Sequence, residues 1–393
     1  MTSLAIAQRS LGDAAPTFPL WPPLTSGCPV TSTDELAFPL EVDYSYADLS
    51  REFRDVRSGP DIARWQELLP PLHAPTLGEG GTPLVELDGV FVKDESRNPT
   101  WSHKDRLNRV TVSAAVGAGA PGIVVSSSGN HGASAAAYAA RAGLDALVLA
   151  SAESPPAVQD FLRAYGAKVL SVPSEGRWPL MRQIVERLGY HPVSNLTVTH
   201  TGHPFGPEGY KSLAYELHDQ LGRTPAAVFV PTGYAELLYG LWKGFRELRD
   251  LGLAEGAPRL YSCESAINAP LSRAFAEGIA AAKIEYTPGS RAYAIGAALS
   301  GYRGVVALRE SGGAALTVTD EELDEAQRRL AGQGLWAELS SAAGLAGYRR
   351  LGQRFDGPVV CVSTSAGFKD LGVGTAPPET VDASWASVER LFI

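Results

Sequence analysis

One lysine, Lys104, stands where its amine could act as a nucleophile. It follows the turn-rich run Asn98-Pro99-Thr100 and opens a stretch in which Leu107, Val110 and Ala114 share one helical face. The start of a helix carries the positive end of its dipole, so this position disfavours an ammonium and lowers the pKa of the lysine. More of the neutral amine can then attack a carbonyl carbon. From this motif alone, a solvated lysine at a helix start remains an open alternative.

Two strand-to-helix turns carry groups suited to binding anions. Ser127-Ser128-Gly129-Asn130-His131 follows the apolar run 122–126, and its N–H groups and hydroxyls could hold a carboxylate. Gly233-Tyr234-Ala235-Glu236-Leu237 follows the run 227–231 and could cradle a phosphate. Each turn also has a purely structural interpretation. The first is then only a helix start, and Glu236 in the second caps the N–H groups of its own helix.

A third turn brings hydroxyls to the end of the apolar run 358–362. The hydroxyl of Thr364 could exchange a hydrogen bond with a heteroaromatic nitrogen, or it could satisfy a donor of its own turn. Ligands of parallel α/β sheets bind beyond the carboxyl ends of the strands. We therefore expect the three turns to come together beyond the carboxyl ends of their strands.

The elements that must position these groups are short apolar strands that alternate with alanine-rich helices. This alternation predicts an α/β fold of two lobes, with parallel or mixed sheets covered by helices on both faces. We expect residues 106–199 to form a small α/β domain that carries the asparagine loop. Residues 1–105 and 200–393 then form a large cofactor-binding domain, with an irregular arm over residues 1–50. Thr319 and Glu322 predict a capping box.

Composition excludes several classes of function. The 393 residues carry a formal net charge of −9 and no long Lys/Arg run, so no nucleic-acid partner is expected. Cys28, Cys263 and Cys361 form no CxxC pair, which argues against a disulfide scaffold or a zinc site and favours a reducing cytoplasm. No metal is expected, and His200 and His203 are assigned to a loop. No stretch predicts a secretion signal or a membrane span, so no membrane partner is expected.

The order of these motifs resembles that of fold type II pyridoxal-phosphate enzymes, the tryptophan-synthase-β type, and among them most the threonine synthases. The resemblance runs from about Arg64 to Asp370 and includes Gly81-Thr82-Pro83-Leu84 and Ser102-His103-Lys104-Asp105-Arg106. It implies pyridoxal 5'-phosphate as cofactor. It also implies site roles: a Schiff base at Lys104, a hydrogen bond from Asn130 to the 3′-oxygen, substrate carboxylate binding by Ser127, Ser128 and His131, phosphate binding by Gly233, Tyr234, Ala235, Glu236 and Leu237, and Thr364 at the pyridine nitrogen.

The chain departs from this family beside the lysine. Trp101 stands where the family usually has glycine, and His103 where it usually has an aromatic or aliphatic residue. We assign both to substrate binding. His103 could be a second acid or base, but neighbours on a helix start diverge by about 100°, so we expect it to point away from Lys104. The phosphate loop also lacks the family's glycine-asparagine pattern.

These departures predict a specialised relative that performs elimination or replacement at Cβ or Cγ of a small amino acid. The leaving group and the nucleophile depend on the shape of the pocket. One alternative is a threonine synthase acting on O-phosphohomoserine, and another is a non-catalytic binding protein of the same fold. We expect a homodimer in the cytoplasm.

Overall fold

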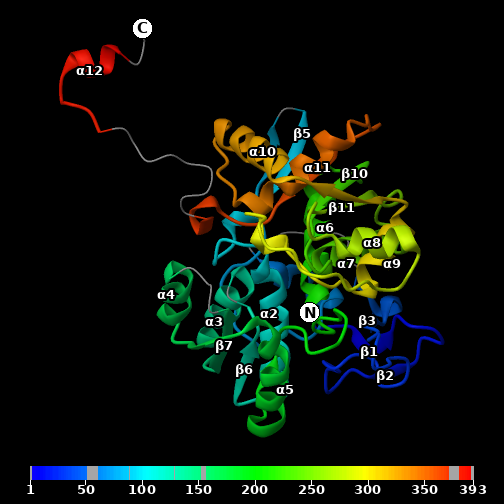
Figure 1. The fold of residues 1–393 in the computed structure, drawn as a ribbon. Helices are drawn as coiled ribbons and strands as arrows, with labels where there is room; N and C mark the ends of the chain where they lie inside the picture. The colour runs from blue at the N-terminus through cyan, green and yellow to red at the C-terminus, as the bar shows by residue number, and fades with distance from the viewer. Residues whose placement is uncertain are drawn as a thin grey trace.

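The structure, a computed structural model, describes residues 2–50, 61–87, 89–127, 129–151, 156–370 and 380–390 (Figure 1). Its centre is a six-stranded sheet in the order β12-β11-β10-β13-β5-β4. Neighbouring strands pair in parallel, except that β4 and β5 are antiparallel. The strands are β4 (Leu84–Leu87), β5 (Val90–Asp94), β10 (Ala227–Pro231), β11 (Arg259–Ser265), β12 (Ala314–Val318) and β13 (Val359–Ser363).

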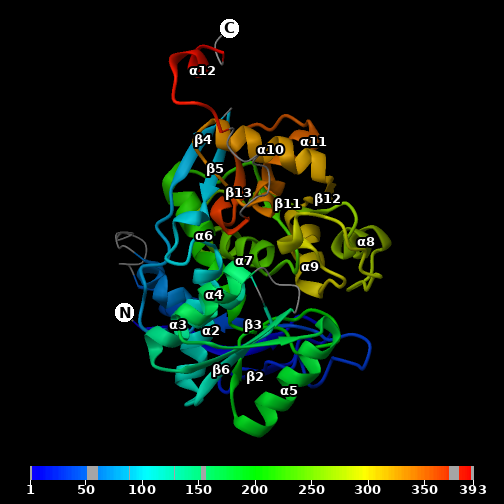
Figure 2. The same cartoon turned by 60° about the vertical axis from the view of Figure 1, so that its left-hand side comes forward.

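Helices cover both faces of this sheet, as the sequence predicts (Figure 2). Successive residues of a strand point to opposite faces. In β10, Val228 and Val230 join the core formed with α6, α7 and α9, whereas Phe229 joins the core formed with α10 and α11. The helices are α6 (Gly206–Leu221), α7 (Glu236–Asp250), α8 (Pro270–Glu277), α9 (Tyr302–Ser311), α10 (Asp320–Gly332), α11 (Ala343–Leu351) and the terminal α12 (Trp385–Glu389). The capping box of Thr319 and Glu322 begins α10, as predicted.

A second, parallel sheet has the order β8-β7-β6-β9. On one face, Ile123 and Val125 pack with α2 and α3, and on the other Val124 packs with α5. Its elements are α2 (Lys104–Gly117), β6 (Gly122–Val125), α3 (Asn130–Ala142), β7 (Asp145–Ser151), α4 (Pro156–Ala164), β8 (Lys168–Val172), α5 (Arg177–Leu188) and β9 (His191–Pro192). Helix α2 packs on both α3 and α6, so it lies between the two sheets. The division into domains at residues 106 and 199 stays a prediction.

The expectation of an irregular N-terminal arm is wrong. Strands β1 (Ala5–Ser10), β2 (Thr17–Pro19) and β3 (Leu40–Tyr44) form an antiparallel sheet in the order β2-β1-β3. The fully buried Gln8 side chain donates to the carbonyls of Pro19, Leu20 and Pro22 and accepts from the Leu24 N–H. Because a buried amide takes the place of an apolar side chain, β1 lacks the alternating pattern that would reveal a strand.

Buried charges join this small sheet to α6 and α7. Lys243 Nζ donates to the Val42 carbonyl at 2.5 Å and to Glu208 Oε1 at 2.7 Å. The hydroxyl of Tyr44 donates to the second oxygen of Glu208 at 2.9 Å. Ionised groups this deeply buried persist only when they are paired and hydrogen-bonded. The N-terminal sheet therefore supplies partners that the core of the chain needs.

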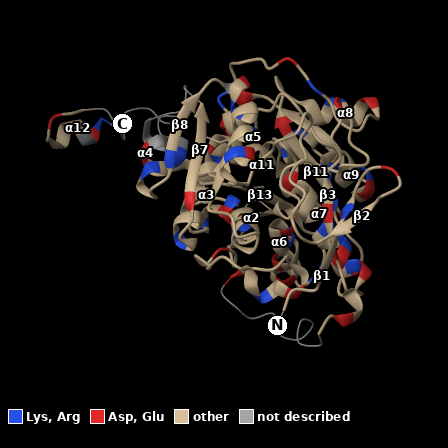
Figure 3. Cartoon of the chain, turned by 90° about the horizontal axis from the view of Figure 1, so that it is seen from below, with Lys and Arg blue, Asp and Glu red and all other residues tan. Residues whose placement is uncertain are grey.

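Charged residues of both signs are interspersed over the molecule (Figure 3). Among the described residues, no helix is long and apolar enough to cross a membrane. The same part of the chain brings together no three His, Cys, Asp or Glu residues that could hold a metal ion. All three cysteines are free and buried.

Candidate active site

Helix α2 begins at Lys104, where the sequence predicts a helix start. The start is tied to β13, because the His103 N–H donates to the Thr364 carbonyl at 2.9 Å. Asp105 accepts hydrogen bonds from the backbone N–H and the hydroxyl of Thr100, at 2.6 and 2.5 Å. The Lys104 side chain is half-buried, and its Nζ lies 5.8 Å from the centre of the Tyr210 ring. Within the described residues, no hydrogen bond holds this amine.

The pKa of Lys104 is lowered, as its position predicts, although burial rather than the helix dipole is the main cause. Glu236 partly opposes this shift because its carboxyl favours the charged amine. Desolvation penalises an ammonium more than a neutral amine. Lys104 therefore keeps a larger neutral fraction than an ordinary surface lysine, as a nucleophile or a base requires.

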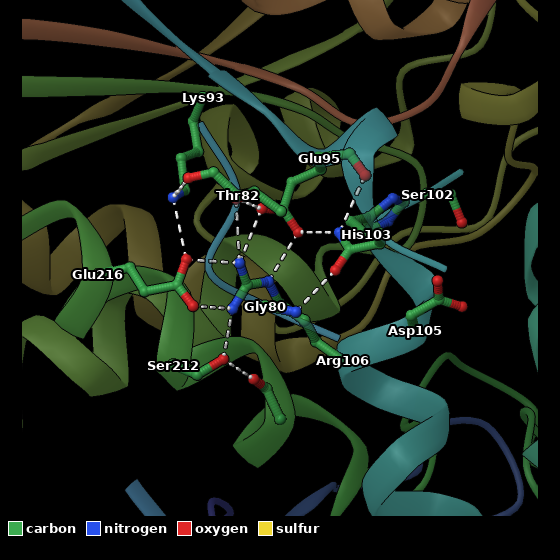
Figure 4. Close-up of polar contacts among 12 residues, drawn as sticks. Gly80, Thr82, Lys93, Glu95, Ser102, His103, Asp105, Arg106, Ser212 and Glu216 are labelled. Atoms are coloured by element: carbon green, nitrogen blue, oxygen red, sulfur yellow. Dashed lines mark hydrogen bonds and ion pairs between the residues drawn. The ribbon is translucent and has the colours of Figure 1, made fainter. Parts of the chain in front are cut away.

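Arg106, in the first turn of α2, reaches from this helix to the carboxylates of Glu95 and Glu216 (Figure 4). Its guanidinium donates to Glu95 from Nε at 2.7 Å and to Glu216 from Nη2 at 2.8 Å. Lys93 also donates to Glu216, at 2.9 Å, and the side chains of Lys93, Glu95, Arg106 and Glu216 are all fully buried. Two cations thus balance two carboxylates. The network joins β5, α2 and α6, so it holds Lys104 at a fixed place above the sheet.

Asn130 is the first residue of α3. Its Oδ1 accepts from Lys369 Nζ at 2.5 Å and from Ser365 Oγ at 3.1 Å, and its Nδ2 donates to Glu338 Oε2 at 2.8 Å. The asparagine loop therefore meets the C-terminal segment, although the two lie more than 200 residues apart in the chain. The turns before α3 and after β13 lie together, as the sequence predicts.

The remaining residues of the asparagine loop are partly described. Ser127 is half-buried, and its hydroxyl accepts from the Gly129 N–H at 3.4 Å. Ser128 lies outside the described residues. Burial, together with the charge of Lys104, lowers the pKa of His131 to about 3, so its ring is neutral. The substrate-binding roles of these three residues stay predictions.

The loop Gly233–Leu237 leads from β10 into α7, which begins at Glu236. The N-cap, Ala235, has a left-handed backbone with φ of 62°, and no side chain caps the helix. The interpretation that Glu236 caps its own helix is therefore not realised. The N–H groups of an uncapped first turn can bind an anion.

Glu236 introduces a carboxyl into this loop. Its Oε2 lies 4.0 Å from Nε2 of His200, whose ring stacks on Tyr234 with centroids 4.2 Å apart. Burial raises the pKa of Glu236, and the charges of Lys104 and Arg303 oppose that rise. The carboxyl is therefore neutral over a wider pH range than an exposed glutamate. A neutral carboxyl does not repel a phosphate.

Thr364 follows the last residue of β13 and is buried. Its hydroxyl lies 2.8 Å from the Ser341 hydroxyl, and either can be the donor. These two hydroxyls, the half-buried amine of Lys104 and the uncapped start of α7 are the kinds of group that would hold a pyridine nitrogen, an aldehyde and a phosphate. The residues present therefore fit pyridoxal phosphate.

Comparison with known proteins supports this fit. Residues 75–365 match the model of the family described as pyridoxal-phosphate dependent enzyme. The chain belongs to this family. Threonine synthase of Methanosarcina acetivorans is 32% identical over 84% of this chain and 86% of that protein. Threonine synthase of Synechocystis is 36% identical over 75% of this chain and 78% of that protein.

Solved structures of similar fold agree with the family. Maize serine racemase superposes with a TM-score of 0.64 at 18% identity, covering 79% of this chain and 92% of that one. Tomato threonine deaminase isoform 2 gives a TM-score of 0.63 at 19% identity, over 75% and 87% of the two chains. At such identities the likeness concerns the fold alone. It confirms the predicted fold type II architecture.

Trp101 stands at a position where the resemblance to the family places a glycine. It adopts φ of 60°, a left-handed conformation that suits the glycine that family members usually have. Its ring lies 5.1 Å from Phe368 and 5.5 Å from Phe161, measured between centroids, and the residue is 38% exposed. Aromatic packing therefore holds a strained residue three positions before Lys104. Its role in substrate binding stays a prediction.

His103 stacks on Tyr210 with ring centroids 5.5 Å apart. Its Nδ1 lies 3.2 Å from the Thr364 carbonyl, which can only accept, so Nδ1 carries the proton and Nε2 is an acceptor. Burial and then the charge of Lys104 lower the pKa of His103 well below its ordinary value. Lys104 also lies against Tyr210, so the two side chains share a neighbour. The expectation that they diverge stays a prediction.

Sequence reasoning missed the part played by Lys369 and Glu338, which both hold the Asn130 amide. Both lie in segments that resemble the family's, but the resemblance gave them no role. No spacing along the chain indicates a contact over such separations. Only the sheet order, which places β13 between β10 and β5, brings these segments to the asparagine loop.

Proposed function

We propose that this protein performs elimination or replacement at Cβ or Cγ of a small amino acid, with pyridoxal phosphate attached at Lys104. The observation that carries the proposal is the half-buried Lys104 amine, with its lowered pKa, beside the end of β13. Pyridoxal phosphate supplies an electron sink that stabilises negative charge at the Cα of a bound amino acid. Every other step falls to side chains of this chain.

The cofactor would be held at three places. The N–H groups of the loop 233–237 bind its phosphate, Asn130 donates to its 3′-oxygen, and the Thr364 hydroxyl meets its ring nitrogen. Thr364 and Ser341 are both neutral hydroxyls, so they do not favour a charged ring as a carboxylate would. This limits how far negative charge spreads into the ring.

Once the substrate's amino group has displaced it from the cofactor, the Lys104 amine would be free to take the proton from the substrate Cα, and its lowered pKa would keep it in the neutral form that accepts that proton. The substrate carboxylate binds at the start of α3, where Ser127, Ser128 and His131 lie in the sequence. A neutral His131 offers a hydrogen bond without adding charge beside Lys104. Loss of a leaving group from Cβ or Cγ is followed by addition of water or another nucleophile.

We favour a specialised relative over a threonine synthase. Trp101 places a large ring three residues before Lys104, and Glu236 places a carboxyl at the phosphate loop. Both change the space and charge that a phosphorylated substrate would meet. The second candidate, threonine synthase acting on O-phosphohomoserine, is supported by 32–36% identity to threonine synthases over most of the chain. The presence of Lys104, Asn130 and Thr364 together argues against a non-catalytic binding protein.

The proposal includes a homodimer in the cytoplasm. The three free cysteines support a reducing compartment, since none is paired or bound in a metal cluster within the described residues. Gel filtration coupled to light scattering would give the oligomeric state directly.

The test uses the purified chain and pyridoxal phosphate. We expect a visible absorbance band that Lys104→Ala removes, and a covalent adduct at Lys104 after borohydride reduction. O-phosphohomoserine is then compared with phospho-, acetyl- and free hydroxy-amino acids, with detection of threonine, phosphate, 2-oxo acids and ammonia. Threonine and phosphate in equal amounts would select the second candidate. Absence of the band, or its survival in Lys104→Ala, would refute the enzyme.

A further inference from the structure

The side chain of Lys369 connects the three parts of the site. It lies in the short 3-10 helix Gly367–Asp370, just after Thr364. Its Nζ donates to Asn130 Oδ1 at 2.5 Å and to the Thr100 carbonyl at 2.7 Å. Thr100 in turn donates to Asp105 in the first turn of α2. One ammonium therefore joins the C-terminal segment to the asparagine loop and to the start of the lysine helix.

The contact with Lys369 fixes the direction of the Asn130 amide. An ammonium can only donate, so the Asn130 atom that faces it must be the carbonyl oxygen. The opposite end of the amide meets Glu338 Oε2 at 2.8 Å, and an ionised carboxylate can only accept. Both neighbours select the same orientation.

This orientation leaves one donor of Asn130 for a ligand. The Nδ2 group carries two hydrogens, and the Glu338 carboxylate takes one of them. Oδ1 is occupied by Lys369 and Ser365. A flipped amide would instead present an acceptor to the ligand. It would also place an NH₂ group against an ammonium, and neither of these groups can accept a hydrogen bond from the other.

We propose that Lys369 is a positioning residue, which holds the Asn130 amide so that its nitrogen donates to the 3′-oxygen of pyridoxal phosphate. This inference rests on the proposed function, because it requires the cofactor at this site. It assigns to a second lysine a role that differs from that of Lys104. Lys369 acts through Asn130 and not on the substrate.

The charge of Lys369 is set by the groups around it. Burial lowers its pKa to about 8, and the charges of Glu338 and Asp105 oppose that fall. The Phe161 ring lies 5.7 Å from Nζ, and His103 is neutral. Below pH 8 the group is therefore an ammonium that can only donate. Above that pH a neutral amine could also accept, and the amide direction would no longer be fixed.

The test is a double-mutant cycle on cofactor affinity. The dissociation constant of pyridoxal phosphate is measured at pH 7 for the full chain, for Lys369→Met, for Asn130→Ala and for the double variant. Because a hydrogen bond to a charged group is involved, we expect Lys369→Met to weaken binding about tenfold. In the Asn130→Ala background the same substitution should change nothing. Lys369→Arg, which keeps the charge, should restore most of the affinity, and the exposed-site control Lys283→Met should equal the wild type.

Equal losses from Lys369→Met in both backgrounds would overturn the proposal, because Lys369 would then act independently of Asn130. Unchanged affinity in Lys369→Met would overturn it too. If Lys369→Met does not fold, Lys369→Gln takes its place in the cycle, since an amide offers both donor and acceptor and cannot fix the direction. A wild-type chain that binds no pyridoxal phosphate would overturn both proposals. If the wild-type chain binds pyridoxal phosphate and Lys369→Met and Lys369→Gln bind it equally tightly, only the proposed role of Lys369 is overturned.

Discussion

The guanidinium of Arg106 and the carboxylate of Glu216 form a two-point ion pair, with Nη1–Oε1 and Nη2–Oε2 distances of 2.8 Å. The same carboxylate accepts from Lys93 and from the Gly81 N–H, each at 2.9 Å. Burial disfavours the charge of Glu216, but Arg106 and Lys93 more than compensate, so its pKa is lowered. Four donors on one buried carboxylate make it the centre of the network that joins β5, α2 and α6.

Replacing the Glu216 carboxylate should lower the free energy of unfolding. In Glu216→Gln, Arg106 and Lys93 keep only Glu95 as a buried counter-charge. Removing one partner of a buried ion pair costs about 3–5 kcal/mol. Urea unfolding measures the loss, and the exposed Glu285→Gln should change stability by less than about 0.5 kcal/mol. Similar losses in the two variants would contradict the importance of the network.

The conformation of Trp101 can be tested by two substitutions at one position. Trp101→Gly and Trp101→Ala both remove the ring and its contacts with Phe161 and Phe368. Only glycine adopts φ of 60° without strain. We expect the glycine variant to be more stable than the alanine variant by about 1 kcal/mol in thermal unfolding. Equal stabilities would show that the backbone at residue 101 is not left-handed.

Glu236 should make cofactor binding depend on pH. Burial raises the pKa of its carboxyl, against the effects of Lys104 and Arg303, so the group stays neutral above the ordinary range of a glutamate and ionises as the pH rises further. An ionised carboxyl beside the phosphate would weaken binding. Glu236→Gln should therefore bind pyridoxal phosphate more tightly than the wild type at alkaline pH, where Glu236 is ionised, and this difference should shrink as the pH falls and the carboxyl becomes neutral. Titrations of cofactor affinity over a range of pH values decide this, and a difference that does not change with pH would refute it.

The close contact of α6 with α2 predicts a glycine that cannot be replaced. A Cβ at Gly209 would collide with the Arg106 carbonyl oxygen, a backbone atom that cannot move away. We expect Gly209→Ala to lose about 1–3 kcal/mol of stability, the usual range for overpacking. At Gly332, in the last turn of α10, a Cβ meets nothing within 4 Å. Gly332→Ala should keep or slightly raise stability in the same denaturant titration, and a tolerated Gly209→Ala would contradict the packing.

Two buried histidines should destabilise the fold in acid. His203 Nδ1 accepts from the Phe205 N–H, so its proton sits on Nε2 and is donated to His191 Nε2 at 2.8 Å. Burial lowers the pKa of His191 to about 4 and that of His203 well below its ordinary value. The unfolded chain binds protons below about pH 6.5 while the folded pair does not, so stability falls from there towards pH 4.

His191→Gln should remove part of this fall. The Gln oxygen can accept the His203 proton, and one titrating group is lost. The slope of stability against pH should decrease by up to about 1.4 kcal/mol per pH unit. Unfolding free energies at several values between pH 4 and 7 measure it. A slope that matches the wild type would exclude His191 as a source of acid sensitivity.

The sequence predicts the elements of the site well and their mutual contacts poorly. Periodicity gives the helix start at Lys104 and the burial of both faces of the sheet, because helical spacing and apolar strands are local signals. It gives neither the central place of β13 nor the contact of Lys369 with Asn130, which joins residues 239 positions apart. Gln8 is a polar residue in the interior of a strand, and its hydrogen bonds to backbone carbonyls compensate for its burial. Trp101 has a left-handed backbone that favours glycine, and its aromatic packing compensates for the strain.

The N-terminal sheet sets a limit on how the chain can be shortened. Arg303 donates to the carbonyls of Leu40 and Thr201, and Lys243 donates to that of Val42. A fragment that starts after residue 50 would keep these buried cations and lose acceptors for both. Such a fragment would expose or neutralise charges inside α7 and α9, next to the loop expected to hold the phosphate. The first fifty residues therefore belong to the folding unit. We expect a chain trimmed at residue 50 to retain less pyridoxal phosphate and, for that reason, to show less activity.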